Sequence, residues 1–233
     1  MILAGRAFSP RVCHSHASPR FRATFVAIVS VCLGISCGGA DSPPNDAETP
    51  APHPWSSLFS APTEIVTPRI YLEPLTPDHT AMDFAAVKSS SEHLRKTLQW
   101  GGWPPAAMTL DDNRFALENH WAEFENHKAY AYTVLAPDKQ PCLGCVYLNP
   151  SNQGETGLSV IFWVRADQLT DNLDIHVVEI LLAHIRDAWP VDFVEFPIPV
   201  QNQRGLEILK KIGLEIGEQS ERETTYLWRR FPP

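Results

Sequence analysis

The first forty residues of this 233-residue chain contain no aspartate or glutamate, and the stretch from Ala23 to Ser36 has no charged residue at all. This apolar stretch is too short to cross a bilayer as a helix, which excludes an ordinary membrane span at this place. Arg20 and Arg22 come directly before it. A basic segment followed by a short apolar one is the pattern of a secretory signal peptide.

The apolar stretch ends at Leu33-Gly34-Ile35-Ser36-Cys37, which resembles a bacterial lipoprotein signal. The resemblance implies that residues 1–37 are a signal peptide and that Cys37 is the lipidation site. Acylation would anchor the protein without a spanning helix, so we expect membrane contact only through the lipid or the signal segment. The expected location is the bacterial cell envelope, lipid-anchored or exported. An ordinary secretory signal, or an upstream extension of a cytoplasmic protein, remains an alternative.

Residues 38–67 show little apolar periodicity, and six prolines stand among Ser, Asp, Thr and Ala. This composition predicts a disordered linker, in which Trp55, Leu58 and Phe59 could dock locally.

Basic residues are scarce in the remainder of the chain. Four of the 19 arginines and lysines precede Cys37, so 15 face 27 acidic residues beyond it. Nucleic-acid binding needs clustered Lys and Arg to neutralise phosphates, so no nucleic-acid partner is expected. A small or cationic partner fits this charge better, although solubility alone also explains it.

Cysteine is also rare beyond the leader, where only Cys142 and Cys145 occur, as a CxxC pair. Such a pair is half of a zinc site or a redox motif. No second pair of ligands follows, and the motif begins a strand instead of a helix. The sequence therefore predicts structural cysteines. His120, Glu123 and His127, and likewise His176, Glu179 and His184, lack the spacing of helical zinc ligands, so no metal is expected.

Residues 68–230 predict one α/β domain. Strands are expected at 69–75, 130–135, 142–148, 158–164, 192–196, 214–218 and 224–228. Helices are expected at 76–87 after Thr76, around 93–98, from Thr109 onward, at 172–189 and at 206–212 before Gly213. Pro197 and Pro199 are expected to end the strand that precedes them.

Four segments in this order resemble the GNAT (GCN5-related N-acetyltransferase) family. They are the "LGxVxL"-like strand 142–148, the strand 160–165, the strand 193–196 after Trp189, and the helix 202–214 with its "N-x-x-G-x-x-x-L-x-K-x-G" pattern. The resemblance covers nearly the whole domain, and the helix is its most specific part. It implies a GNAT-like fold, with a mixed central sheet flanked by helices.

The same resemblance implies acetyl-CoA as the co-substrate, bound where two central strands separate. The pantetheine arm would bind the backbone of Phe162, Trp163, Val164 and Arg165. The pyrophosphate would lie on the loop that begins at Gln168 and includes Asn172, near the start of the next helix, with Asn202 close by. Helix amides and the helix dipole favour an anion at such a place.

The expected loop departs from the family pattern, because Asp171 and Leu173 stand where glycines belong. Asp171 and Asp174 would repel a pyrophosphate by about 1–4 kcal/mol each at a surface-like dielectric. Two hypotheses follow. The first is an N-acetyltransferase that acts on a small-molecule or peptide amine. The second is a non-catalytic, GNAT-like binding or scaffold lipoprotein of the cell envelope, where acetyl-CoA is scarce.

Catalytic residues are not identified by the sequence. The reaction needs a base for the amine and an acid for the leaving thiolate. Many relatives place a tyrosine in the last helix, where this chain has Leu209. Glu155 and Glu195 are candidate bases, but Glu195 fits a solvated strand residue as well. Trp100 and Trp103 lie where an acceptor pocket is expected, or they fill the core.

Overall fold

The computed structural model describes residues 59–230, and the leader and most of the linker lie outside this range. The folded domain begins before Pro68, within the segment that the composition assigned to the linker. Strand β1 (Ile65–Val66) pairs with the next strand, and Ala61 is buried. The ring of Phe59 packs 4.6 Å from that of Trp189. These few apolar residues outweigh the linker-like composition because each finds a place against the core.

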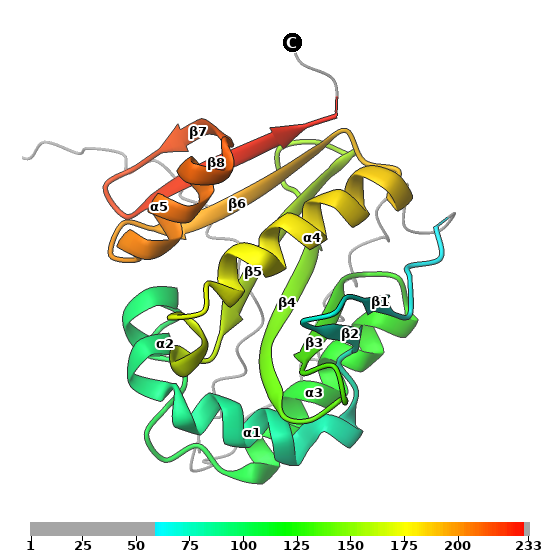
Figure 1. Ribbon diagram of the computed structural model, residues 1–233, viewed down its shortest axis with the longest axis vertical. Helices are drawn as coiled ribbons and strands as arrows, with labels where there is room; N and C mark the ends of the chain where they lie inside the picture. Colours follow the sequence, from blue (N-terminus) through cyan, green and yellow to red (C-terminus); the bar gives the residue numbers. More distant parts are fainter. Residues whose placement is uncertain (1–58, 231–233) are drawn as a thin grey trace, which may run out of the picture. The chain divides into compact units, whose positions relative to one another are not determined.

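Eight strands form one sheet in the order β1-β2-β3-β4-β5-β6-β8-β7 (Figure 1). All neighbours are antiparallel except β5 and β6, which are parallel. Beyond β1, the strands are β2 (Tyr71–Pro74), β3 (Tyr130–Leu135), β4 (Cys142–Pro150), β5 (Gly157–Val164), β6 (Phe193–Pro199), β7 (Glu215–Gln219) and β8 (Glu223–Arg229). The predicted mixed sheet is confirmed.

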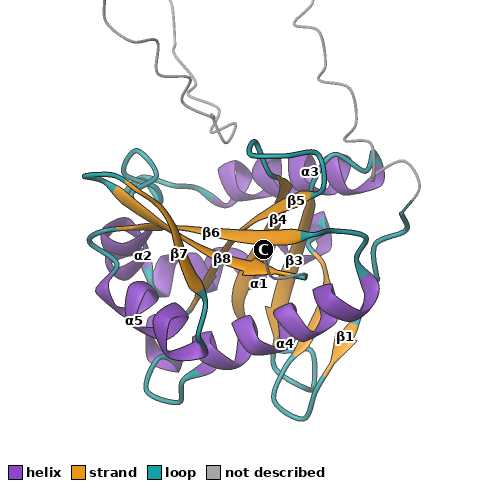
Figure 2. Cartoon of the chain, turned by 90° about the horizontal axis from the view of Figure 1, so that it is seen from above, coloured by secondary structure: helices purple, strands orange, loops and turns teal. Residues whose placement is uncertain are grey.

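Helices cover both faces of the sheet, with α4 and α5 on one side and α3 on the other (Figure 2). Thr109 caps α3 through the amide of Asp112, and Gly213 ends α5 with a φ of 89°. The bounds are η2 (Pro77–His79), α1 (Thr80–Ser89), α2 (Ser91–Leu98), α3 (Leu110–Glu125), η3 (Ala166–Gln168), α4 (Leu173–Ala188) and α5 (Gln203–Ile212). In residues 59–230, no helix is both long and apolar enough to span a membrane.

Strands β5 and β6 pair only at their beginnings, from Gly157 to Ser159, and then separate. The sequence suggested that Pro197 ends β6, but the strand continues through Pro199 because its other edge pairs with β8. The amide of Val200 donates to the carbonyl of Arg222. The alternation of a strand therefore directs the backbone of Pro197 and Pro199 toward β5. Proline has no N–H, so neither residue can donate across to β5, and the two strands stay apart.

A β-bulge interrupts the pairing of β3 and β4, because Val134 faces Gly144 while Leu135 faces Cys142. The bulge leaves Leu143 unpaired and turns Cys142 to the same face as Cys145. Next to it, a β-carbon on Gly144 would overlap the carbonyl oxygen of Trp163 and lie 2.8 Å from Cα of Val164. Glycine is therefore required here because the backbone of β5 passes too close for a side chain.

Candidate functional site

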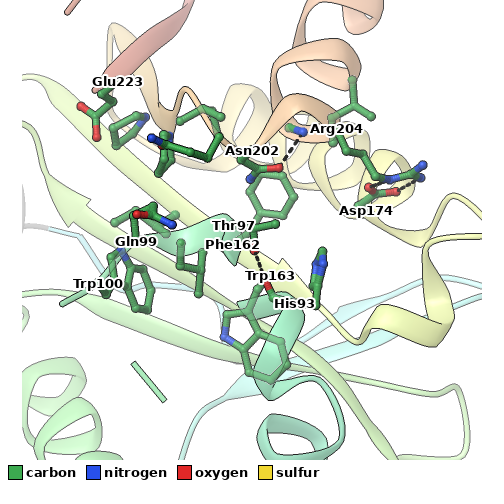
Figure 3. Close-up of a pocket in the computed structure, with 18 of the residues that line it drawn as sticks. His93, Thr97, Gln99, Trp100, Phe162, Trp163, Asp174, Asn202, Arg204 and Glu223 are labelled. Carbon is green, nitrogen blue, oxygen red and sulfur yellow. Dashed lines mark hydrogen bonds and ion pairs between the residues drawn. The ribbon is translucent and has the colours of Figure 1, made fainter. Parts of the chain in front are cut away.

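The space between the separated strands is a cavity of about 440 Å³. Its walls are the ends of β5 and β6, its floor is made by the beginnings of α4 and α5, and α2 stands on the remaining side (Figure 3). A cavity of this size is typical of small-ligand sites in proteins. We call this cavity between the separated ends of β5 and β6 the wedge, and the prolines of β6 keep it open.

One wall of this cavity is a strand edge with free backbone groups. The amide of Arg165 donates to the carbonyl of Leu143, which fixes the alternation of β5 against β4. The N–H and C=O groups of Phe162 and Val164 must then point away from β4 and toward the cavity. An extended ligand with amide groups can pair with this edge as an added strand does.

The floor of the cavity is closed by an ion pair between α4 and α5. Arg204 donates through Nη2 to Oδ1 of Asp174 at 2.8 Å, and its Nε donates to Oδ2 of the same carboxylate. Nη2 also donates to the carbonyl of Leu169 at 2.8 Å and lies 3.3 Å from Oδ1 of Asn172. One guanidinium thus neutralises Asp174 and fixes the loop before α4. The sequence predicts that Asp174 repels a pyrophosphate. In the structure Arg204 neutralises this carboxylate, and the spacing of the two residues in the sequence did not reveal the pair.

The loop before α4 obtains its turn from an asparagine. Asn172 has a φ of 53° and stands at the N-cap of α4, so it takes the left-handed conformation that a glycine would otherwise supply. Asp171 is exposed, and its carbonyl oxygen accepts a hydrogen bond from Arg69 at 2.9 Å. The missing glycines therefore do not prevent the loop from forming.

The residues that the resemblance assigned to the coenzyme divide into two groups. Phe162, Trp163, Val164 and Asn202 line the cavity. Asn202 also accepts the amide of Gly205 at 2.9 Å and so caps α5. Arg165 points elsewhere and pairs with Asp167, while Gln168 lies in η3 and Asn172 contacts Arg204. These last three stay predictions, because the cavity walls do not include them.

Helix α2 and Gln99, the residue that follows it, contribute side chains that the sequence did not single out. His93, Thr97 and Gln99 line the cavity, and Thr97 is held by a hydrogen bond to the carbonyl of His93 at 2.9 Å (Figure 3). Burial lowers the pKa of His93 below its ordinary value. The ring is therefore neutral at pH 7, and it can donate or accept a hydrogen bond in the cavity.

An aromatic cluster lies on the opposite face of the sheet from α4. Trp100 lies 5.4 Å from Trp103 and 5.9 Å from Tyr147, and Trp103 lies 6.5 Å from Trp163, measured between ring centroids. Trp100 and Trp163 also line the cavity, so the cluster extends from the core to its opening. Trp100 and Trp103 pack against the core, and Trp100 also reaches the cavity, while the acceptor pocket stays a prediction.

Glu195 is the better placed of the two candidate bases. It is 7% exposed and pairs in register with Ser159, where β5 and β6 begin to separate. Burial raises its pKa, and the hydroxyls of Ser151 and Ser159 partly oppose that effect. Glu155 lies exposed in the loop between β4 and β5. Glu195 does not line the cavity, so as a candidate base it would act from the point where the two strands separate.

The histidine sets considered for metal binding are not brought together. His120 lies 3.4 Å from Glu123, whereas His127 contacts Tyr130. His176 contacts Thr67, and Nε2 of His184 is buried without a partner among residues 59–230. None of them forms a ligand cluster in the described part of the chain.

Comparisons with known proteins agree with this geometry. A family model described as an acetyltransferase (GNAT) domain matches residues 69–215, well over half of the chain. A comparison with curated protein sequences finds no match.

Three solved structures illustrate the likeness of fold. The RimL ribosomal L7/L12 alpha-N-protein acetyltransferase in complex with coenzyme A has a TM-score of 0.62 at 12% identity, over 71% of this chain and 96% of that one. The microcin C7 self-immunity acetyltransferase MccE in complex with acetyl-CoA and AMP has a TM-score of 0.62 at 15% identity, over 72% and 97%. The ribosomal-protein-S5-alanine acetyltransferase from Vibrio fischeri has a TM-score of 0.61 at 9% identity, over 72% and 97%. With the open sheet and the matched family model, the chain belongs to the GNAT acetyltransferase family.

Proposed function

We propose that this protein is an N-acetyltransferase that transfers the acetyl group of acetyl-CoA to an amine. The observation that carries the proposal is the wedge between β5 and β6, with its free backbone edge at Phe162 and Val164. Membership of the family supports the same reaction. The neutralised floor at Arg204 and Asp174 removes the main objection to coenzyme binding, and so the enzyme is preferred to a scaffold.

The chain's own groups suit each part of this reaction. The free edge of β5 can hold the pantetheine arm by backbone hydrogen bonds, which extends the sheet across the cavity. The beginnings of α4 and α5 supply amides toward the pyrophosphate, and the helix dipoles favour its charge. Glu195, which lies outside the cavity lining, accepts the proton of the attacking ammonium through water, so that the amine can attack the thioester carbonyl. The carbon–sulfur bond then breaks, and the thiolate leaves.

The acceptor is proposed to be an amine attached to an apolar or aromatic group. Trp100 is half-buried at the opening, in contact with Trp103 and Tyr147. Aromatic faces attract cations and also pack against apolar groups. An ammonium on such a group would meet this cluster on its way to Glu195. A small-molecule or peptide amine can each satisfy the requirement.

The test is calorimetric titration of the protein with acetyl-CoA and, separately, with acetyl-pantetheine, which lacks the pyrophosphate. We expect acetyl-CoA to bind at micromolar concentration and acetyl-pantetheine to bind more weakly, because only the former reaches α4 and α5. Release of free thiol in the presence of an amine panel then measures turnover. Absence of heat and of thermal stabilisation at millimolar acetyl-CoA would contradict the proposal.

The location of the protein is a separate proposal. The charge-free stretch before Cys37 supports export and lipidation, and both lie outside the residues that the structure describes. Mass spectrometry of the N-terminus isolated from bacterial membranes tests it. An acylated N-terminal Cys37 is expected, and an intact N-terminus beginning at Met1 would contradict it.

A further inference from the structure

Two thiols and a carboxylate meet in the interior, away from the coenzyme wedge. Asp83 comes from α1, and Cys142 and Cys145 come from β4. One ligand atom from each, the two sulfurs and a carboxylate oxygen, lies within 4.8 Å of the other two. All three residues are buried, with exposures of 3%, 0% and 0%.

The β-bulge of β4 creates this arrangement. In a regular strand, residues three apart point to opposite faces, so the two thiols of a CxxC segment would be separated by the sheet. The unpaired Leu143 removes that alternation, and Cys142 and Cys145 both face α1. The bulge thus brings both cysteines of the CxxC segment to one face of the strand.

Asp83 is held in a fixed orientation toward the sulfurs. Its Oδ1 accepts from Sγ of Cys145 at 3.2 Å, and its Oδ2 accepts from Nδ2 of Asn113 at 2.9 Å. Asn113 is itself 2% exposed and also donates to the carbonyl of Thr80. No Lys or Arg side chain forms an ion pair with Asp83 anywhere in residues 59–230. A buried carboxylate needs either a proton or a counter-charge, and a bound metal ion is one such counter-charge.

We propose that Asp83, Cys142 and Cys145 bind one zinc ion. Thiolate and carboxylate ligands together suit zinc, with Zn–S distances of about 2.3 Å and Zn–O distances of about 2.0–2.2 Å. Tetrahedral geometry then places neighbouring ligand atoms about 3.5–3.8 Å apart. Sγ of Cys145 lies 3.2 Å from Oδ1 of Asp83, and all three ligand atoms lie within 4.8 Å of one another, so shifts of about 1 Å or less reach these values. The amide of Asn113 orients the carboxylate from behind, as an outer hydrogen bond does for many metal ligands.

Binding removes a proton from each thiol, and both protons go to solvent. The two thiolates and the carboxylate then carry three negative charges against the two positive charges of zinc. No fourth Cys, His, Asp or Glu belongs to the cluster among the described residues, so a water completes the tetrahedron. A groove of about 740 Å³ borders α1, Pro141 and Cys142, but Cys142 is 0% exposed, so an ion would enter from the groove only when this wall opens.

The ion would serve the structure and not the acetyl transfer. It would join α1 to β4, and Cys145 is the register partner of Trp163 on β5. A fixed β4 supports the strand whose free edge forms the wedge. The inference does not depend on acetyl-CoA binding, because its readout is metal content.

The experiment measures zinc in the full-length protein by elemental analysis and records the absorption spectrum after cobalt replaces zinc. We expect the C142S/C145S variant of the full chain to contain one equivalent of zinc less than the parent protein. Both proteins keep the leader cysteines, so any zinc bound there cancels in the comparison. Cobalt should give thiolate charge-transfer and tetrahedral d–d bands that the double variant lacks. Thr225→Val is the matched control, because Thr225 is a buried strand threonine on β8, which is separated from β4 by two strands of the sheet.

Two milder variants keep the inference testable if the double variant does not fold. Asp83→Asn keeps the size of the side chain and should weaken zinc affinity at least tenfold. Asn113→Leu removes only the orienting amide and should weaken it about 10- to 100-fold. Equal zinc content in the full chain and in C142S/C145S would overturn the proposal. So would a Cys142–Cys145 disulfide, detected as a mass two hydrogens lower in protein purified without reductant.

Discussion

Arg204→Gln should weaken acetyl-CoA binding mainly by leaving Asp174 without its partner. Arg204 holds the carboxylate through two hydrogen bonds, and the side chains are 37% and 6% exposed. Glutamine is too short and carries no charge, so a buried negative charge would remain at the floor of the wedge. The same change releases the carbonyl of Leu169, which Arg204 also binds.

Two free energies follow from this geometry. Removal of one partner of a buried ion pair costs about 3–5 kcal/mol, and the partial exposure of Arg204 lowers the expected loss of stability to about 2–3 kcal/mol. If a phosphate charge lies about 6 Å from Asp174 at an effective dielectric near 20, the repulsion is about 3 kcal/mol. That repulsion corresponds to about a 100-fold increase in the Kd of acetyl-CoA. High salt should reduce the effect, because it screens charges near the surface.

The assay is a double-mutant cycle of Arg204→Gln and Asp174→Asn, with acetyl-CoA affinity measured by calorimetry at low and high salt. The double variant should regain most of the lost affinity, because the uncompensated charge is gone. Arg186→Gln is the matched control, since Arg186 pairs with Asp187 on the surface at exposures of 59% and 67%. Urea unfolding of each variant confirms that the domain is folded where binding is measured.

The reasoning would be refuted by either of two results. One is an Arg204→Gln protein that binds acetyl-CoA as the parent does at low salt. The other is a double variant no better than Arg204→Gln alone, which would make Arg204 a direct phosphate ligand and not a partner for Asp174.

Three further predictions concern the sheet, the base and the opening. Gly144→Ala should lower the free energy of unfolding by several kcal/mol, because its β-carbon would overlap the backbone of β5. Gly154→Ala is the control and should change the free energy of unfolding little, since the nearest side-chain atom is 3.4 Å from the added β-carbon. Urea unfolding compares the two variants. The raised pKa of Glu195 means that this carboxyl is still partly protonated above its ordinary value of 4.5, so kcat/KM should fall as pH drops through the raised pKa. Glu195→Gln should abolish that acidic limb, and an unchanged profile would remove Glu195 from the mechanism. Trp100→Ala should raise the KM for apolar amines about tenfold and leave the Kd of acetyl-CoA nearly unchanged, which initial-rate kinetics and calorimetry check separately.

The sequence predicts the elements well where local signals and tertiary packing agree. The predicted end of the last helix at Gly213 is confirmed, and the structure adds a cap at Asn202, so the helix begins at Gln203, earlier than its apolar residues indicated. The strand at 158–164 is buried on one face along its length, so its apolar run is sufficient to identify it. The mixed sheet follows from the order of these elements and from the family resemblance.

Other features depend on contacts that local sequence does not contain. Arg204 is thirty residues from Asp174, and nothing in the loop pattern shows that they meet. Asp83 is separated from Cys145 by 62 residues, so the CxxC segment alone could not reveal a third ligand. Phe59 lies in a proline-rich segment and yet packs against Trp189, because burial of one ring outweighs linker composition.

The prolines of β6 also determine whether a coenzyme must break hydrogen bonds between β5 and β6 before it can bind. In a sheet without them, β5 and β6 could close upon each other in the empty protein, and a ligand would have to break strand hydrogen bonds before it could bind. Pro197 and Pro199 provide no donors for such closure, so a closed ladder between β5 and β6 would lack every hydrogen bond that their N–H groups would have made. The pocket is therefore prepared in advance, and the binding free energy is not spent on separating the strands.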